Sequence, residues 1–447
     1  MTIQCDCCGS VSDLDESFIT ARKSFRLQKS TFCPQCWAER ELESNKSWLW
    51  LIGLFLLIVV ILWFFGSKEA SRLFGIILFI VFLSAIIIPH ELGHALMARL
   101  LGMRVFMIVV GSGRTLKKLQ LVGFTWEIKQ FPLYGFTICC AKSAQFYRLK
   151  RLLVTLSGPA VNFVLLLLAL YSYRSFSVIE SWSIPFMPFA SFAFANFWML
   201  LFNLAPHRYK TAYGKFRSDG LSLLTIPFSS NADIHQNIVF YYALEGLELR
   251  KNGQLSQALQ WYQKALSIYP EDTTILNDYA LTLMDAEQFE EARAIYSRII
   301  EKQEPNARLK AIVLNNLAYT DILMGEKALI EEADATSSQA FKSCPWIPAI
   351  KGTRGMVLVE MGQLDEGIRL LTDALGKNEE LQNKALNTAY LAVAEARKGN
   401  ITRAQQYLET TSQFDSDCLL LKRAQDELSI QALNFRQTLD CKVRHSS

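Results

Sequence analysis

Long apolar runs dominate the first half of the chain. Residues 48–65 carry no charge and have a tryptophan near each end, and sixteen uncharged residues, 73–88, begin a segment that extends to 101. Two more apolar runs occupy 152–173 and 184–204. A helix needs about 20 apolar residues to cross a bilayer, and tryptophan is enriched at the membrane surface. The pattern therefore predicts a bundle of about four membrane-spanning helices.

Between the second and third of these runs the pattern changes to short apolar stretches broken by glycine. Strands are expected at 105–110, 119–124, 126–130 and 131–136, forming a small hairpin or sheet. The edge of such a sheet could bind an extended peptide through main-chain hydrogen bonds. A plain connecting loop is the alternative.

From Ile238 onward the composition is that of a helical domain with a 34-residue repeat. The first unit has Gly246, Ala258, Tyr262 and Ala265, and the second has Ala280, Ala292, Tyr296 and Ile299. This period is typical of tetratricopeptide repeats, which stack helix pairs into a solenoid. The expected fold is therefore mainly α: a polytopic membrane bundle with a small β insertion, a short N-terminal metal-binding segment and a C-terminal α-solenoid.

The charge distribution predicts how the chain crosses the membrane. Residues 102–151 contain nine Lys and Arg but one acid, Glu127, so this loop is expected on the cytoplasmic side. Four crossings would place both the N-terminal segment and the repeats there too. No secretory signal is visible, because the first apolar run begins only at Trp48. A multi-pass protein of a bacterial inner membrane is the predicted localisation.

The sequence HELGH at 90–94 lies inside the second apolar segment. Histidines four apart share one helix face, so His90 and His94 could bind the same zinc ion. Glu91, next to the first ligand, could act as the general base of peptide hydrolysis. Ionisable groups at membrane depth are costly and mark functional sites. Pro89 should bend the helix or free a carbonyl just ahead of His90.

The first 45 residues contain two Cys-x-x-Cys pairs. Cys5, Cys8, Cys33 and Cys36 are expected to bind a second, structural zinc ion, which would stabilise a segment too short for an apolar core. Cys7 could replace a neighbour. Free cysteines in a disordered tail are the alternative, and a redox dithiol is less favoured. The four basic residues Arg22, Lys23, Arg26 and Lys29 are a weak case for nucleic acid, which is not expected as a partner.

Further polar residues lie near the apolar runs. Asn162 follows Gly158-Pro159 in the third run, and Asn203 lies near the end of the fourth. Asp219 follows after a polar loop and precedes Gly220. A carboxylate from a separate segment is what two helix histidines lack to complete a three-ligand site.

Together these motifs resemble the site-2 protease family of intramembrane zinc metalloproteases, over about residues 73–225. The resemblance implies zinc held by His90, His94 and Asp219, Glu91 as general base, and Asn162 or Asn203 holding the substrate or its developing oxyanion. One departure is the spacing: thirteen positions separate Pro206 from Asp219, whereas in many members the aspartate follows within a few residues. His207 and Asp233 are the alternative third ligands.

The predicted domains are residues 1–45 (zinc-ribbon-like), 46–72 (first membrane helix and loop), 73–230 (protease core) and 231–440 (repeats). The leading hypothesis is an intramembrane metalloendopeptidase that cleaves membrane-spanning or membrane-proximal proteins, with both soluble domains recruiting a substrate or a cytoplasmic partner protein. A catalytically silent scaffold acting through the repeats is the alternative. A membrane-tethered regulator of transcription would require residues 1–45 to bind DNA.

Overall fold

The computed structural model describes residues 68–177, 186–211, 214–302, 307–376 and 381–445, together with four short N-terminal strands. These strands form two small antiparallel hairpins, β1 (Ile3–Gln4) with β2 (Val11–Ser12) and β3 (Ile19–Arg22) with β4 (Lys29–Phe32). The N-terminal cysteines and the first predicted span, 48–65, lie outside the described residues. The chain divides into two compact units, one comprising 47–253 with 260–270 and the other the remaining residues.

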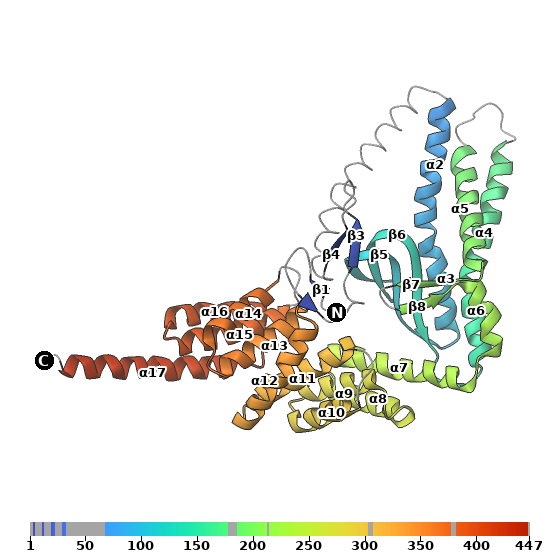
Figure 1. The fold of residues 1–447 in the computed structure, drawn as a ribbon. Helices are drawn as coiled ribbons and strands as arrows, with labels where there is room; N and C mark the ends of the chain where they lie inside the picture. Colours follow the sequence, from blue (N-terminus) through green and yellow to red (C-terminus); the bar gives the residue numbers. More distant parts are fainter. Residues whose placement is uncertain are drawn as a thin grey trace. The chain divides into compact units, whose positions relative to one another are not determined.

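Four helices build the apolar part of the first unit: α2 (Lys68–Ala85), α3 (Ile87–Leu100), α4 (Tyr147–Ser177) and α5 (Phe186–Leu204). Helix α5 packs against α2 and α4, and α3 packs against α4; Figure 1 shows α2, α4 and α5 side by side. The segment expected as one long helix is interrupted at Ile86. This interruption lies about one turn before His90 and confirms the expected distortion there. Its cause is Pro89, which has no N–H to donate to the carbonyl one turn earlier.

In the described part of the chain, two helical segments are long and apolar enough to cross a membrane. They are Phe74–Leu100, which runs through α2 and α3, and Tyr147–Arg174, which lies within α4. The segment Pro188–Leu204 of α5 is a shorter apolar helix. Large apolar side chains face outward along these helices: Ile76, Ile80, Val81, Phe163, Val164, Leu167, Leu168, Phe194, Phe197, Trp198 and Leu201. The count of about four spans stays a prediction.

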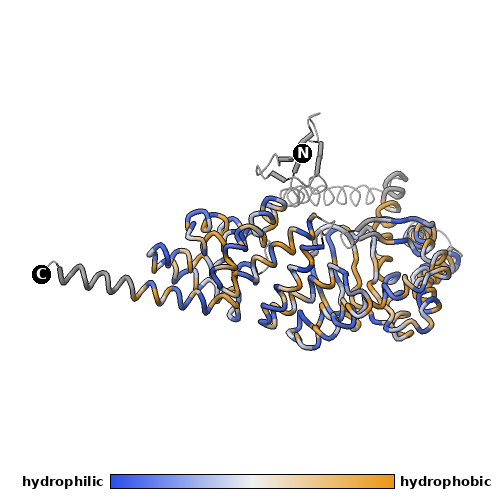
Figure 2. The backbone as a smooth tube through the Cα atoms, turned by 60° about the horizontal axis from the view of Figure 1, so that its bottom comes forward, coloured by the Kyte–Doolittle hydropathy of each residue, from blue (hydrophilic) through white to orange (hydrophobic). Residues whose placement is uncertain are grey.

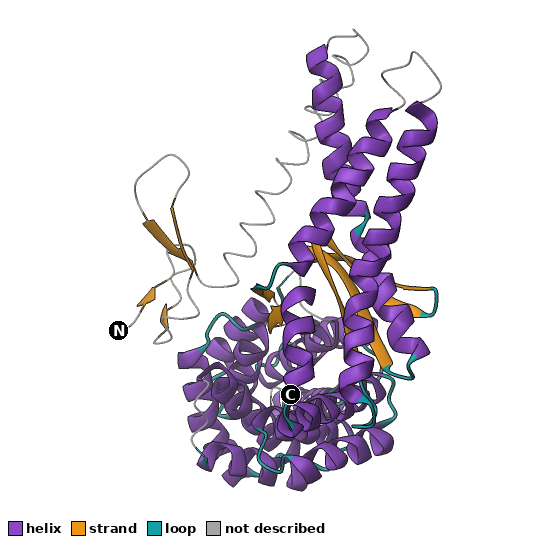
Figure 3. Ribbon diagram, turned by 90° about the vertical axis from the view of Figure 1, so that its right-hand side faces the viewer, coloured by secondary structure: helices purple, strands orange, loops and turns teal. Residues whose placement is uncertain are grey.

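A long antiparallel hairpin, β5 (Arg104–Leu121) and β6 (Phe124–Cys140), follows α3. Its turn, Val122-Gly123, has positive φ at both residues, so the expectation of a continuous strand over 119–124 is wrong there. Residues 108–110 pair with 126–128 and also with 135–137, so the hairpin curls back on itself. Its buried residues pack on α3, and Figure 3 shows the strands at one end of the helices.

After α5 the chain forms another hairpin and three helical elements. These are β7 (Arg208–Thr211), β8 (Gly214–Arg217), α6 (Asp219–Thr225), η2 (Ile226–Phe228) and α7 (Asn231–Lys251). Ser230 and Asp233 form a capping box that begins α7. Ile234 and Ile238 of α7 pack against buried residues of α3 and β6, and Glu245 pairs with Arg104 at 3.0 Å. Helix α7 is therefore part of the same compact unit as the apolar helices.

The remaining helices follow one another with short connections. They are α8 (Leu255–Ile268), α9 (Thr273–Asp285), α10 (Phe289–Glu301), α11 (Ala307–Met324), α12 (Lys327–Ser343), α13 (Pro348–Glu360), α14 (Leu364–Ala374), α15 (Leu381–Arg397), α16 (Ile401–Phe414) and α17 (Leu421–His445). Tyr262 and Tyr296, 34 residues apart, are both fully buried. Hydrophobic and hydrophilic stretches alternate along these helices (Figure 2). The mainly helical prediction is confirmed.

Candidate metal centre

The HELGH sequence lies on α3, whose geometry places His90 and His94 one turn apart. Both side chains are buried. Their Nε2 atoms are 3.2 Å apart, and the two rings are nearly perpendicular. The two imidazoles therefore direct a ring nitrogen toward the same point.

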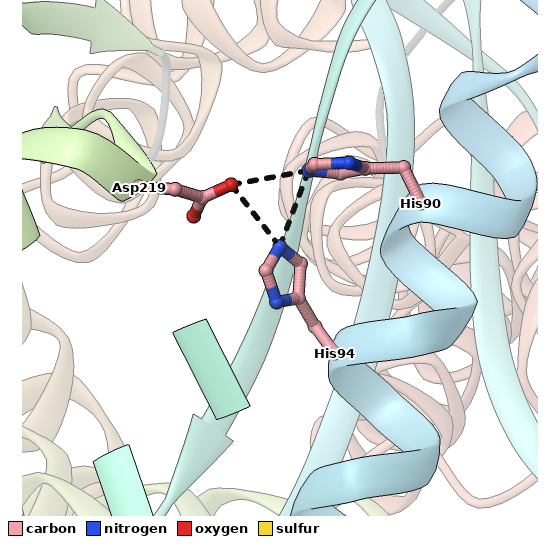
Figure 4. Close-up of side chains that lie close together, drawn as sticks. All are labelled: His90, His94 and Asp219. Carbon is pink, nitrogen blue, oxygen red and sulfur yellow. Dashed lines mark hydrogen bonds and ion pairs between the residues drawn. The ribbon is translucent and has the colours of Figure 1, made fainter. Parts of the chain in front are cut away.

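Asp219, the first residue of α6, reaches this point from the opposite side (Figure 4). Its Oδ2 lies 3.2 Å from His90 Nε2 and 3.5 Å from His94 Nε2. Burial raises the pKa of the Asp219 carboxyl, but the two histidines outweigh burial and leave that pKa below its usual value. All three donor atoms lie within 4.8 Å of one another. The carboxylate proposed from a distant segment is thus brought to the histidines.

Hairpin β7–β8 explains the long spacing before Asp219. The Ser218 N–H donates to the His207 carbonyl at 2.9 Å, and Ser218 Oγ donates to the Ala205 carbonyl at 2.7 Å. These bonds close the base of the hairpin just before Asp219. The residues between Pro206 and Asp219 therefore form a hairpin that returns the chain to the end of α5.

The two alternative third ligands lie elsewhere. The Nδ1 atom of His207 is 2.9 Å from the carbonyl of Ala205. The Asp233 carboxylate accepts from the N–H and the hydroxyl of Ser230 at the start of α7. In the described part of the chain, only His90, His94 and Asp219 form a group of this kind.

Two glycines permit the close approach of these elements. A Cβ on Gly158 of α4 would lie 2.3 Å from His94 Nε2 and 2.9 Å from His90 Cε1. A Cβ on Gly220 would lie 1.8 Å from the Leu204 carbonyl oxygen. Larger residues at these positions would displace the histidines or the start of α6.

A buried polar network contacts the Nδ1 atoms of the two imidazoles, on the side away from Asp219. His90 Nδ1 is hydrogen-bonded to Asn162 Oδ1, and Asn162 Nδ2 donates to Asn196 Oδ1 at 3.1 Å. His94 Nδ1 lies 2.6 Å from the Val154 carbonyl. Partners of this kind fix the tautomer and orientation of metal-binding histidines. Asn162 is wholly buried and contacts the ring nitrogen that faces away from Asp219.

Glu91 lies beside the histidines but is not one of the three converging donors. Thr137 Oγ1 donates to Glu91 Oε2 at 2.8 Å and also contacts the Glu91 carbonyl at 3.1 Å. A Cβ on Gly135 would come within 2.8 Å of Glu91 Cγ. Strand β6 therefore fixes the position of this carboxylate.

A cavity of about 600 Å³ opens next to these groups. Glu91, both histidines and Asp219 line it, as do residues of β6, the β7–β8 hairpin and α7. Asn203 also lines it, with Nδ2 3.4 Å from His90 Nε2. The site is accessible to a ligand larger than water.

Two histidine nitrogens, one carboxylate oxygen and an adjacent cavity are the donor set and open position of a catalytic zinc site. The residues present therefore fit a zinc ion. Sequence reasoning missed Asn196 and Thr137. Asn196 could have been noticed as an amide in the middle of an apolar helix, whereas Thr137 carries no such signal.

One comparison with known proteins bears on this site. The profile of peptidase family M50 matches residues 78–320, more than half of the chain. No curated protein sequence matches it. Among solved structures, TTC0263, a thermophilic TPR protein of Thermus thermophilus, is 18% identical, covers 42% of this chain and 98% of its own, and has a TM-score of 0.35. YrrB, a TPR protein with an unusual peptide-binding site, is also 18% identical, with coverages of 41% and 90% and a TM-score of 0.29. The chain belongs to peptidase family M50, the site-2 protease family of metallopeptidases.

Proposed function

We propose that the chain is an intramembrane zinc metalloendopeptidase that hydrolyses peptide bonds of membrane-spanning or membrane-proximal proteins. The observation that carries this proposal is the convergence of His90, His94 and Asp219 beside Glu91, on helices whose outward side chains are apolar. The HELGH sequence directly follows the apolar residues 74–88 and lies in the same apolar segment, Phe74–Leu100. The reaction would therefore take place at membrane depth, close to one surface.

The proposed orientation follows from the charge pattern. With about four spans, the basic residues of 102–151 would lie on the cytoplasmic side of a bacterial inner membrane, as would both soluble ends. Asp219 and α7 would then lie on that side as well. A released fragment would enter the cytoplasm.

In this mechanism His90, His94 and Asp219 would hold zinc, and Asn162 and the Val154 carbonyl would keep the two rings in place. Zinc acts as a Lewis acid, polarising the scissile carbonyl and lowering the pKa of water. Glu91 would take a proton from the attacking water and pass it to the leaving amide nitrogen. The Thr137 hydroxyl would orient Glu91 for both transfers.

The two asparagines would have different roles. Asn162 is buried and engaged with His90 and Asn196, which favours an orienting role over direct substrate contact. Asn203 lines the cavity on the Nε2 side of His90, where its amide could stabilise the developing oxyanion. The substrate would bind extended along the edge of β6 at 134–137, next to Glu91.

The soluble segments would select what reaches the site. Cys5, Cys8, Cys33 and Cys36 would bind a second, structural zinc ion, and the repeats would bind a cytoplasmic protein partner or the substrate. Nucleic acid is not a proposed partner. Residues 231–440 would form the tetratricopeptide-repeat domain.

Substituting Glu91→Gln tests the proposal directly, because it removes the base and keeps the three zinc donors. We expect zinc binding to persist and cleavage of co-reconstituted single-span membrane proteins to stop. Glu301→Gln, at an exposed position in the repeats, is the matched control and should leave cleavage unchanged. If wild-type protein and Glu91→Gln bind zinc equally and neither cleaves any single-span protein, the alternative of a catalytically silent scaffold acting through the repeats is favoured.

A further inference from the structure

The β7–β8 hairpin has two chemically different faces. Tyr209 pairs with Phe216, while Arg208 pairs with Arg217 and Lys210 with Lys215. Because side chains alternate along a strand, Tyr209 and Phe216 share one face, and Arg208 and Arg217 share the other, which we call the basic face. Neither face had a role in the sequence-based hypotheses.

The aromatic face covers the cavity of the metal centre. The Phe216 ring lies 4.7 Å from the Phe136 ring, and the Tyr209 ring 6.1 Å from the Tyr134 ring, measured between centroids. Tyr209 and Phe216 both line the cavity with Glu91 and Asp219. They pack on the segment of β6 along which a substrate strand would bind.

The basic face places like charges directly opposite one another. Such pairs destabilise a two-stranded sheet, which is marginal in water even without them. Arg208 and Arg217 are exposed, and neither forms an ion pair with a described acidic residue. Arg217 donates to the Thr225 hydroxyl at 3.0 Å, and its charge also acts on the nearby Asp233 carboxylate, with which it forms no direct ion pair. A bound anion would relieve this repulsion.

The surroundings of the hairpin indicate which anion. Strand β7 begins four residues after the end of the apolar helix α5. Leu224 and Phe228, which are 61% and 86% exposed, line a surface cavity together with Arg217 and Arg151. Exposed apolar side chains beside basic ones are typical of segments that bind the interface of anionic membranes.

We propose that the basic face of the β7–β8 hairpin binds anionic phospholipid headgroups at the membrane surface, and that this contact holds Tyr209 and Phe216 over the cavity. The hairpin is thus a positioning element whose order depends on lipid charge. This inference rests on the membrane location in the proposed function but not on proteolysis. The test below uses no cleavage assay, so the two can fail separately.

Hydrogen–deuterium exchange of the full chain in lipid nanodiscs tests it. One sample contains phosphatidylcholine alone and the other also contains phosphatidylglycerol. Each basic residue at an anionic surface strengthens attachment about fivefold. We therefore expect amides of residues 208–217 to exchange at least about fivefold more slowly with phosphatidylglycerol, and the difference to shrink at high salt.

Charge variants separate this contact from a general attraction to anionic lipid. Arg208→Glu with Arg217→Glu should abolish the lipid-dependent protection. Lys327→Glu with Lys342→Glu, at exposed positions of the repeats, makes the same change in net charge and should keep it. Arg208→Glu alone creates an opposite-charge pair with Arg217, so the hairpin should be protected in phosphatidylcholine alone.

Equal exchange of the wild-type hairpin in the two lipids would overturn the inference. So would loss of the lipid effect in the repeat-domain control. Protection by an added acidic peptide, without any effect of phosphatidylglycerol, would assign the basic face to a protein partner instead.

Discussion

Asn162 offers a sensitive test of how the protein holds its proposed zinc ligands. It is wholly buried, 72 residues from His90 in sequence, and its amide bridges His90 Nδ1 and Asn196 Oδ1. Asn162→Ala removes both bonds at a position that is closed to bulk solvent. The imidazole of His90 would then lose its orientation, although all three zinc donors remain.

Two independent considerations give the size of the effect. A buried polar group left without a partner costs about 1–3 kcal/mol. Loss of an outer hydrogen-bond partner of a metal-binding histidine lowers metal affinity about 10–100-fold, which corresponds to about 1.4–2.7 kcal/mol. These ranges overlap. We therefore expect Asn162→Ala to bind zinc about 10–100-fold more weakly than wild type.

Competition with a chromophoric chelator, using full-length protein in nanodiscs, measures this affinity. The N-terminal cysteines are replaced in all samples so that a single site is titrated. Asn162→Asp keeps an acceptor for His90 and should retain tight binding. Asn237→Ala is the matched control, because Asn237 lines the same cavity but accepts from the Ala141 N–H at 3.2 Å. Folded Asn162→Ala protein with wild-type zinc affinity would refute the orienting role.

Two further substitutions test the geometry of the site. Asp219→Ala should abolish zinc binding in the same titration, whereas His207→Ala and Asp233→Ala should retain it; the reverse pattern would mean that the third ligand is misassigned. Gly158→Ala should also lose zinc, because its Cβ would lie 2.3 Å from His94 Nε2, while Gly376→Ala, whose Cβ meets nothing within 4 Å, should bind normally. Equal zinc affinity of Gly158→Ala and Gly376→Ala would show that α4 does not constrain the histidines.

Local patterns predicted the parts of the site that depend on helix geometry. The four-residue spacing of His90 and His94 places both on one face of any helix, and Pro89 interrupts hydrogen bonding wherever that helix lies. Short apolar stretches broken by glycine likewise predicted strands after α3. The turn at Val122-Gly123 was misplaced because an apolar valine in a left-handed conformation gives no turn signal.

Tertiary contacts decided the rest. Asp219 was the ligand that the family resemblance implied, but local patterns alone left His207 and Asp233 as alternatives, because the position of Asp219 depends on the bonds that close the β7–β8 hairpin at Ser218. Thr137 reaches Glu91 only because β6 packs beside α3. A one-dimensional pattern carries little information on contacts between residues this far apart in the chain.

An anomalous-diffraction map at the zinc edge, from crystals of the chain, tests the proposed zinc site most directly. We expect a peak about 2.0–2.2 Å from the Nε2 atoms of His90 and His94 and from Asp219 Oδ2, with Glu91 close by but not bound to the metal. A zinc ion whose third protein ligand is His207 or Asp233, or zinc-saturated crystals with no peak between the two histidines, would contradict it.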